Sequence, residues 1–203
     1  MLDVAKKYEE EIHRKYYDTW YDPHYQYYRD SSGDRLPQFA DNCYERRDFV
    51  CLDDKDNHVI GYISYSFNEV SCSAFNFGII SFEKCNLTFA KDLLQVISDI
   101  FFKFHLDRME FWCIADNPAV KGYRSFIKRF GGREVGYLRR STRLMDGKFH
   151  DTLIFEILRE DLKWRWTDDR HIVQELAYRT DYTEQEKYFP GTPSDFDDKE
   201  FIK

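Results

Sequence analysis

The chain has 203 residues, 18% of them aromatic, and a formal net charge of -7 at pH 7. The aromatic content excludes a disordered chain, and the negative charge argues against a nucleic-acid binder, although it leaves room for local basic patches. No apolar run approaches the roughly 20 residues that span a bilayer, and the N-terminus lacks the apolar core of a signal peptide. The five cysteines include no CxxC pair, which predicts reduced thiols in a cytoplasmic protein without a metal site.

Residues 1–44 are predicted to form a helical region. Residues 3–21 repeat apolar and aromatic side chains near one helical face. Tyrosines dominate residues 21–29, and the Ser-Ser-Gly-Asp run at 31–34 indicates a loop. Pro37 blocks a continuing helix.

Residues 45–160 are predicted to form an α/β core. Three strands with short turns suggest an antiparallel meander, and an amphipathic helix follows them. A helix between this meander and a further strand implies one parallel or splayed pairing in a mixed sheet. The predicted strands are 49–52, 58–67, 71–82, 109–114, 133–142 and 152–158, and the predicted helices are 88–104 and 118–130.

The stretch 109–132 is the most compact unit of this pattern. An apolar strand ends before Asn117, which is expected to cap the next helix, with Pro118 at its first position. Gly131 and Gly132 are expected to end that helix, because glycine accepts the left-handed conformation.

From residue 161 the pattern weakens. After Tyr182 the chain is polar, acidic and interrupted by proline and glycine. This composition predicts a C-terminal extension over residues 161–203, with a loose or partner-dependent tail.

Three motifs stand out: Asp116-Asn117-Pro118-Ala119 after the fifth strand, Phe130-Gly131-Gly132 after the next helix, and Leu144-Met145-Asp146-Gly147-Lys148 before the last strand. Together with the order of elements they resemble the GNAT family of acyl-CoA N-acyltransferases, in particular its ribosomal-protein-alanine acetyltransferase branch and phage-encoded relatives. The resemblance implies a three-layer α/β (α+β) fold, whose mixed, mostly antiparallel sheet has a V-shaped split between strands 4 and 5 and helices on both faces. It also implies transfer of acetyl from acetyl-CoA to a primary amine by direct attack.

The family's pyrophosphate loop, Q/R-x-x-G-x-G/A, has an altered counterpart here, Cys85-Asn86-Leu87-Thr88-Phe89-Ala90. Ala90 fits the last position, whereas Thr88 replaces the first glycine and Cys85 replaces Gln or Arg. In the family, the backbone N–H groups of this loop and the helix N-terminus bind the CoA pyrophosphate. The resemblance therefore implies a cofactor-binding set of Asn86, Thr88, Phe89, Ala90 and Lys91.

The resemblance also assigns the fourth strand a role in binding acetyl-CoA. In the family a backbone N–H at a bulge in this strand polarises the thioester carbonyl. This implies that Ile79, Ile80 and Ser81 contact the cofactor, and Gly78 is consistent with a bulge or a close approach there. Asn117 matches an asparagine that contacts the cofactor arm, and it is equally suited to a plain helix cap.

Two side chains are candidates for proton transfer. Tyr123 is the candidate acid toward the CoA sulfur, by resemblance to a tyrosine in the family's corresponding helix, and core packing is its alternative role. Glu83, at the end of the fourth strand, is the candidate base, directly or through water. Its alternative role is that of a solvated surface carboxylate.

The acceptor stays open among a protein N-terminus, a lysine and a small amine, and the net charge favours a cationic one. The aromatic stretch 21–29 forms either a cleft wall that receives this amine through cation–π contacts or an oligomer or partner interface, including that of a homodimer. A second hypothesis is a catalytically degenerate GNAT-fold binding protein, supported by the altered loop at 85–90.

Overall fold

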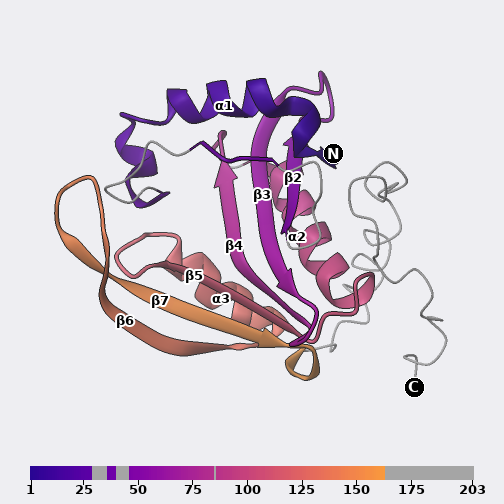
Figure 1. Cartoon of the computed structure of the whole chain (residues 1–203), viewed down its shortest axis with the longest axis vertical. Coiled ribbons are helices and arrows are strands. Elements are labelled where there is room, and N and C mark those ends of the chain that lie inside the picture. Colours follow the sequence, from indigo (N-terminus) through magenta and orange to yellow (C-terminus); the bar gives the residue numbers. More distant parts are fainter. Residues whose placement is uncertain (29–35, 40–45, 85, 163–203) are drawn as a thin grey trace.

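The computed structural model describes residues 1–28, 36–39, 46–84 and 86–162. Over these ranges a seven-stranded sheet carries three α-helices and three short 3-10 helices (Figure 1). The strands are β1 (Leu2–Val4), β2 (Arg46–Leu52), β3 (Val59–Asn68), β4 (Ser73–Ser81), β5 (Arg108–Ile114), β6 (Arg133–Arg143) and β7 (Phe149–Leu158). The helices are η1 (Ala5–Tyr8), α1 (Glu9–Asp18), η2 (Pro23–Tyr28), α2 (Leu87–Phe102), α3 (Val120–Phe130) and η3 (Arg159–Asp161). The predictions for Cys85 and for residues 163–203 lie outside the described residues.

The sheet has the strand order β1-β2-β3-β4-β5-β7-β6. Every neighbouring pair is antiparallel except β4 and β5, which run parallel. These two strands pair only where Ser73 meets Arg108 and Ala74 meets Met109. Beyond this point they diverge (Figure 1). The predicted mixed sheet is confirmed, with its V-shaped split between β4 (predicted strand 71–82) and β5 (predicted strand 109–114).

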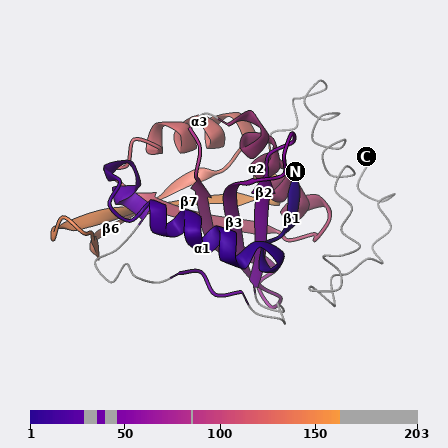
Figure 2. The ribbon, with the colours of Figure 1, turned by 90° about the horizontal axis from the view of Figure 1, so that it is seen from above.

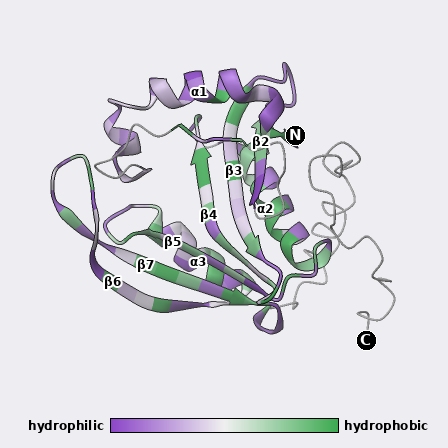
Figure 3. Cartoon of the chain, in the orientation of Figure 1, coloured by the Kyte–Doolittle hydropathy of each residue, from purple (hydrophilic) through white to green (hydrophobic). Residues whose placement is uncertain are grey.

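Helices cover both faces of the sheet, as predicted (Figure 2). Neighbouring residues of a strand point to opposite faces, so β2 contributes Phe49 and Cys51 to the core under α2 and α3, and Val50 and Leu52 to the core under α1. Ile12 is the fully buried anchor of α1. Figure 3 shows that α1 is otherwise mostly hydrophilic, which fits a surface helix with one buried stripe.

The first strand is absent from the sequence prediction, which assigned residues 3–21 to a helix. Leu2 instead pairs with Cys51 and Val4 with Phe49, and the terminal ammonium of Met1 donates to the Leu52 carbonyl over 2.6 Å. Because β1 spans three residues, its alternation is too short to differ visibly from a helical repeat. The N-terminal residues therefore belong partly to the sheet.

The helix α3 begins two residues later than predicted. Asn117 Oδ1 accepts from the N–H of Ala119 over 2.9 Å and the Asn117 carbonyl accepts from Val120, so Asn117 stabilises a turn before the helix. The predicted end is confirmed, since the N–H of Gly131 donates to Ile127 and Gly131 has a φ of 106°. Among the described helices, none is long and apolar enough to cross a membrane.

Candidate active site

The pairing of β4 with β3 is irregular along the split. Ser66 pairs with Phe75 and Ser64 with Gly78, so β4 carries one extra residue between these pairs. Asn76 lies in that extra stretch with a φ of 51°. The bulge therefore precedes Gly78. Of the two roles predicted for this glycine, a bulge and a close approach, the bulge does not apply. Gly78 serves a close approach, because a Cβ atom there would lie 2.9 Å from Ser64 Oγ.

The residues after the bulge present backbone rather than side chains to the split. Ile80 is buried in the core under α1, and Ile79 packs against the core under α2 and α3. Ser81 Oγ donates to the Glu83 carbonyl over 2.6 Å. Any contact of these three residues with a ligand in the split would therefore involve mainly their peptide groups.

The N-terminus of α2 follows the end of β4, and Asn86 caps it. Asn86 Oδ1 accepts from the N–H of Phe89 over 3.1 Å, and the Asn86 carbonyl accepts from Ala90 over 3.2 Å. The ring of Phe89 packs onto Gly61, where a Cβ atom would lie 2.3 Å from it. Within the described residues, Leu87 and Thr88 keep first-turn N–H groups without an intramolecular acceptor.

Carboxylates surround this helix N-terminus. Thr88 Oγ1 donates to Asp54 over 3.0 Å, and Asn86 Nδ2 donates to Glu83 over 2.9 Å. Lys91, a further predicted cofactor contact, is exposed on the same helix. A helix N-terminus favours anions, and here the protein's own acids already lie beside it.

His58 links Glu83 to a further carboxylate, Asp56. Its Nε2 lies 2.5 Å from Glu83 and its Nδ1 lies 2.5 Å from Asp56. These hydrogen bonds raise the pKa of His58, and the bond from His58 lowers the pKa of Glu83. A carboxylate with a lowered pKa holds a proton weakly, so the role of Glu83 as a general base stays a prediction.

We expect His58→Gln to cost more stability near pH 6 than near pH 9. The raised pKa of His58 means that the folded chain binds this proton more tightly than the unfolded chain, whose ordinary value is 6.5. The stabilisation is full below the unfolded pKa and is lost as the pH rises through the folded pKa. Both side chains are about one third exposed, so solvent screens the pair and the cost near pH 6 is at most about 1 kcal/mol.

Thermal unfolding of both proteins at the two pH values measures this difference. The double variant His58→Gln/Glu83→Gln is the matched control, because removing His58 from a chain without the Glu83 charge should cost less near pH 6. An equal cost at both pH values would show that the ionic link does not stabilise the fold.

Tyr123 lies across the split, on α3. Its half-buried ring packs against Phe111 at a centroid distance of 5.5 Å and against Phe155 at 5.9 Å. Burial, followed by the neighbouring Tyr28 and Cys113, raises the pKa of its hydroxyl. The phenol thus keeps its proton at neutral pH, as a general acid requires, and packing and proton donation are compatible roles.

The aromatic segment η2 is attached to the β4 side of the split. The Tyr25 hydroxyl donates to the Ser81 carbonyl over 3.1 Å, and the Tyr25 and Tyr28 rings lie 5.6 Å apart. Tyr28 also contributes to the raised pKa of Tyr123. The sequence showed the tyrosines but held no local signal for the bond from Tyr25 to Ser81, because 56 positions separate these residues.

The β6–β7 turn is attached to the β5 side. Asp116, just after β5, lies 3.0 Å from Nδ1 of His150, and Nε2 of His150 lies 3.2 Å from Asp146 in the turn. The hydrogen bond with Asp116 raises the pKa of His150. The structure thus places η2 at the end of β4 and the hairpin turn at the end of β5.

Comparisons with known proteins identify the fold. No family model and no curated protein matches this sequence. Spermidine N-acetyltransferase from Vibrio cholerae, solved in complex with CoA and spermine, aligns with 79% of this chain and 96% of its own at a TM-score of 0.58 and 20% identity. The chain has the GNAT fold. The sequence-based expectation of this fold is therefore confirmed.

Two further GNAT-fold structures align with shorter parts of the chain. Mutant forms of the spermidine/spermine N-acetyltransferase from Vibrio cholerae align with 57% of this chain and 68% of their own at 27% identity and a TM-score of 0.48. Ribosomal-protein-S5-alanine acetyltransferase from Vibrio fischeri aligns with 58% and 64% at 20% identity and a TM-score of 0.47.

Proposed function

We propose that this protein is an N-acyltransferase that transfers acetyl from acetyl-CoA to a primary amine. The split carries the proposal: β4 and β5 separate after two paired positions, and β4 is bulged at Asn76 along the way. An extended ligand with amide groups can pair with the free edge of such a strand. The CoA and spermine held by the structure that shares this fold support the same reading.

The reaction needs one nucleophile, one polarised carbonyl and one proton donor. The neutral amine attacks the thioester carbon, while a backbone N–H of β4 stabilises the developing oxyanion. The carbon–sulfur bond then breaks, and the Tyr123 hydroxyl gives its proton to the leaving thiolate. Glu83 takes the proton lost by the attacking amine, through water.

The split and the N-terminus of α2 are not equally suited to binding acetyl-CoA. The split provides strand backbone for the extended arm, and Asn117 follows directly after β5. At α2, the N–H groups of Leu87 and Thr88 and the ammonium of Lys91 favour a pyrophosphate, but Asp54 contacts Thr88 directly. The affinity for acetyl-CoA is therefore expected to be weak.

We expect Asp54→Asn to raise the affinity for acetyl-CoA about tenfold. Removing one negative charge at about 6 Å from a pyrophosphate relieves roughly 1–3 kcal/mol of repulsion at a protein surface. Calorimetric titration at low salt measures the change. Glu69→Gln is the matched control, since Glu69 is an exposed carboxylate at the other end of β4. An unchanged or weaker affinity in Asp54→Asn would contradict the proposed phosphate position.

A second candidate function is a GNAT-fold binding protein without catalysis. The observation that favours it is the same set of carboxylates around α2, with Asn86 already occupying the Phe89 N–H. A helix N-terminus that binds no anionic ligand needs acceptors from the protein itself for its first N–H groups, and Asn86 supplies one of them.

A turnover assay separates the two functions. Release of the CoA thiol is followed with three amines: a peptide N-terminus, a lysine side chain and a small polyamine. The acyltransferase proposal predicts acetylated product with at least one of them, and predicts its loss in Ala90→Glu, which adds a negative charge at the proposed phosphate position. Absence of product with all three amines would favour the binding protein.

A further inference from the structure

Positive charge is concentrated in one segment, although the chain as a whole carries -7. Residues 121–148 have a formal charge of +7 and form α3, β6 and the turn after β6. Their acidic side chains are Glu134 and Asp146, and their basic side chains are Lys121, Arg124, Lys128, Arg129, Arg133, Arg139, Arg140, Arg143 and Lys148.

Part of this charge is already paired with carboxylates of the same chain. Arg124 pairs with Glu134 over 2.6 Å, and Arg133 pairs with Glu156 over 2.9 Å. These pairs hold α3 and β7 against the first half of β6. Neither pair involves the arginines in the second half of β6.

Three arginines of that half form what we call the arginine edge: Arg139, Arg140 and Arg143. All three are exposed, and within the described part of the chain no carboxylate pairs with them. The Arg140 guanidinium lies over the Phe149 ring at 5.3 Å, and Arg143 Nε donates to the Gly147 carbonyl over 3.1 Å. Arginine in such positions binds carboxylates through several N–H groups at once.

The backbone also departs from regular pairing at the arginine edge. Leu138 pairs with Thr152 and Thr142 with His150, so β6 carries two extra residues between these pairs. Arg140 has a φ of 50° within this bulge, and its N–H is held by Asp151 over 2.8 Å. Bulges redirect side chains near functional sites.

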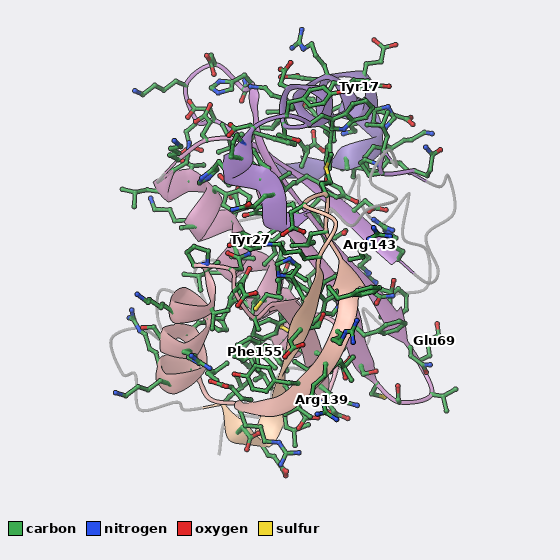
Figure 4. The ribbon with its side chains drawn as sticks, turned by 90° about the vertical axis from the view of Figure 1, so that its left-hand side faces the viewer. Tyr17, Tyr27, Glu69, Arg139, Arg143 and Phe155 are labelled. Atoms are coloured by element: carbon green, nitrogen blue, oxygen red, sulfur yellow. The ribbon has the colours of Figure 1, made fainter. Side chains whose placement is uncertain are left out.

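The arginine edge lies beside the mouth of the split. The turn after it is attached to the end of β5 by His150, and η2 stands on the opposite side at the end of β4. Figure 1 shows the hairpin of β6 and β7 extending past the end of β5 on the side of η2. In Figure 4, Arg139 and Arg143 lie along the hairpin of β6 and β7, and Tyr27 of η2 lies at about the level of Arg143.

We propose that the amine acceptor is a polypeptide with acidic residues close to its reactive amine, and that the arginine edge binds those residues. The inference rests on the proposed acetyl transfer and names its substrate class. The strand β6 is the last in the sheet, so its outer edge is also open to an extended chain. A short acidic segment can bind this small basic patch without reaching the rest of the protein surface. A long polyanion would extend past the patch, where the acidic remainder of the protein would repel it.

Anisotropy of two labelled peptides, measured without acetyl-CoA, tests the binding. One peptide carries a run of Asp and Glu behind a free N-terminus, and the other carries Asn and Gln at the same positions. At low salt the acidic peptide is expected to bind at least about tenfold more tightly. The triple variant R139E/R140E/R143E should abolish this preference, and K121E/K128E/R129E on α3, with the same change in charge, should retain it.

Turnover with the same two peptides keeps the inference separate from the proposed function. Equal binding and equal acetylation of both peptides would overturn the inference and leave the acyltransferase standing. A binding preference without acetylation of either peptide would overturn the acceptor role together with the acyltransferase. Tighter binding of a single-stranded RNA oligonucleotide than of the acidic peptide would overturn the polypeptide as partner. Loss of the preference in the α3 variant alone would overturn the assignment to the arginine edge.

Discussion

Tyr123→Phe is expected to lower kcat for acetyl transfer about 100-fold and to leave the KM for acetyl-CoA nearly unchanged. The substitution removes only the hydroxyl, so the ring keeps its packing on Phe111 and Phe155. Because burial raises the pKa of this hydroxyl, the wild-type side chain is protonated when the thiolate leaves. Without it, the thiolate must take a proton from water.

Tyr137→Phe is the matched control for this experiment. Tyr137 is an exposed residue of β6 whose hydroxyl accepts from Arg124, and its loss should change kcat by less than about twofold. Because burial raises the pKa of Tyr123, its ionisation lies above the working pH range, and the readout that packing alone would not move is a lowered kcat with an unchanged KM for acetyl-CoA. Activity within about threefold of wild type would leave Tyr123 with a packing role only.

Phe155→Ala is expected to lower the free energy of unfolding by about 3–5 kcal/mol. Phe155 has no exposed surface, and its ring stacks on Phe111 at a centroid distance of 5.0 Å. Phe155 lies on β7 (Figure 4), and its ring also contacts Tyr123 of α3. Truncation leaves a cavity between these rings that the rigid sheet cannot close.

Denaturant unfolding measures this loss, and Phe149→Ala provides the control on the same strand. Phe149 is 53% exposed, so its truncation should cost less than about 1 kcal/mol. A cost below about 2 kcal/mol for Phe155→Ala would mean that the rings repack, and that Tyr123 is not held as rigidly as the proposed proton transfer needs.

The parts of the fold that sequence reasoning found are those with local signals. The apolar stripe of residues 88–104 indicates α2, and Gly131 indicates the end of α3. Gly147, which has a φ of 78°, indicates the β6–β7 turn. The order of these elements, with the GNAT resemblance, was enough to place the split. The three residues of β1 carry too little pattern to compete with the helical repeat that follows them.

The site was harder to anticipate because its contacts join distant positions. The bond between His58 and Glu83 spans 25 positions, and the bond between Thr88 and Asp54 spans 34. No period or motif connects such residues, so the carboxylates around α2 emerged only with the fold. The bulge at Asn76 likewise depends on how β4 pairs with β3, and Gly78 nearby marks the close approach to Ser64 rather than the bulge.

Thermal unfolding with acetyl-CoA tests the central claim, that this GNAT fold still binds the acyl donor. At about 100 times its dissociation constant the ligand should stabilise the protein by roughly 2.7 kcal/mol, which for a chain of this size is a rise in Tm of several degrees. We predict a saturable rise at concentrations up to about a millimolar, and its loss in Ala90→Glu. A Tm that does not move over that range would contradict the account and leave the GNAT-fold binding protein as the function to pursue.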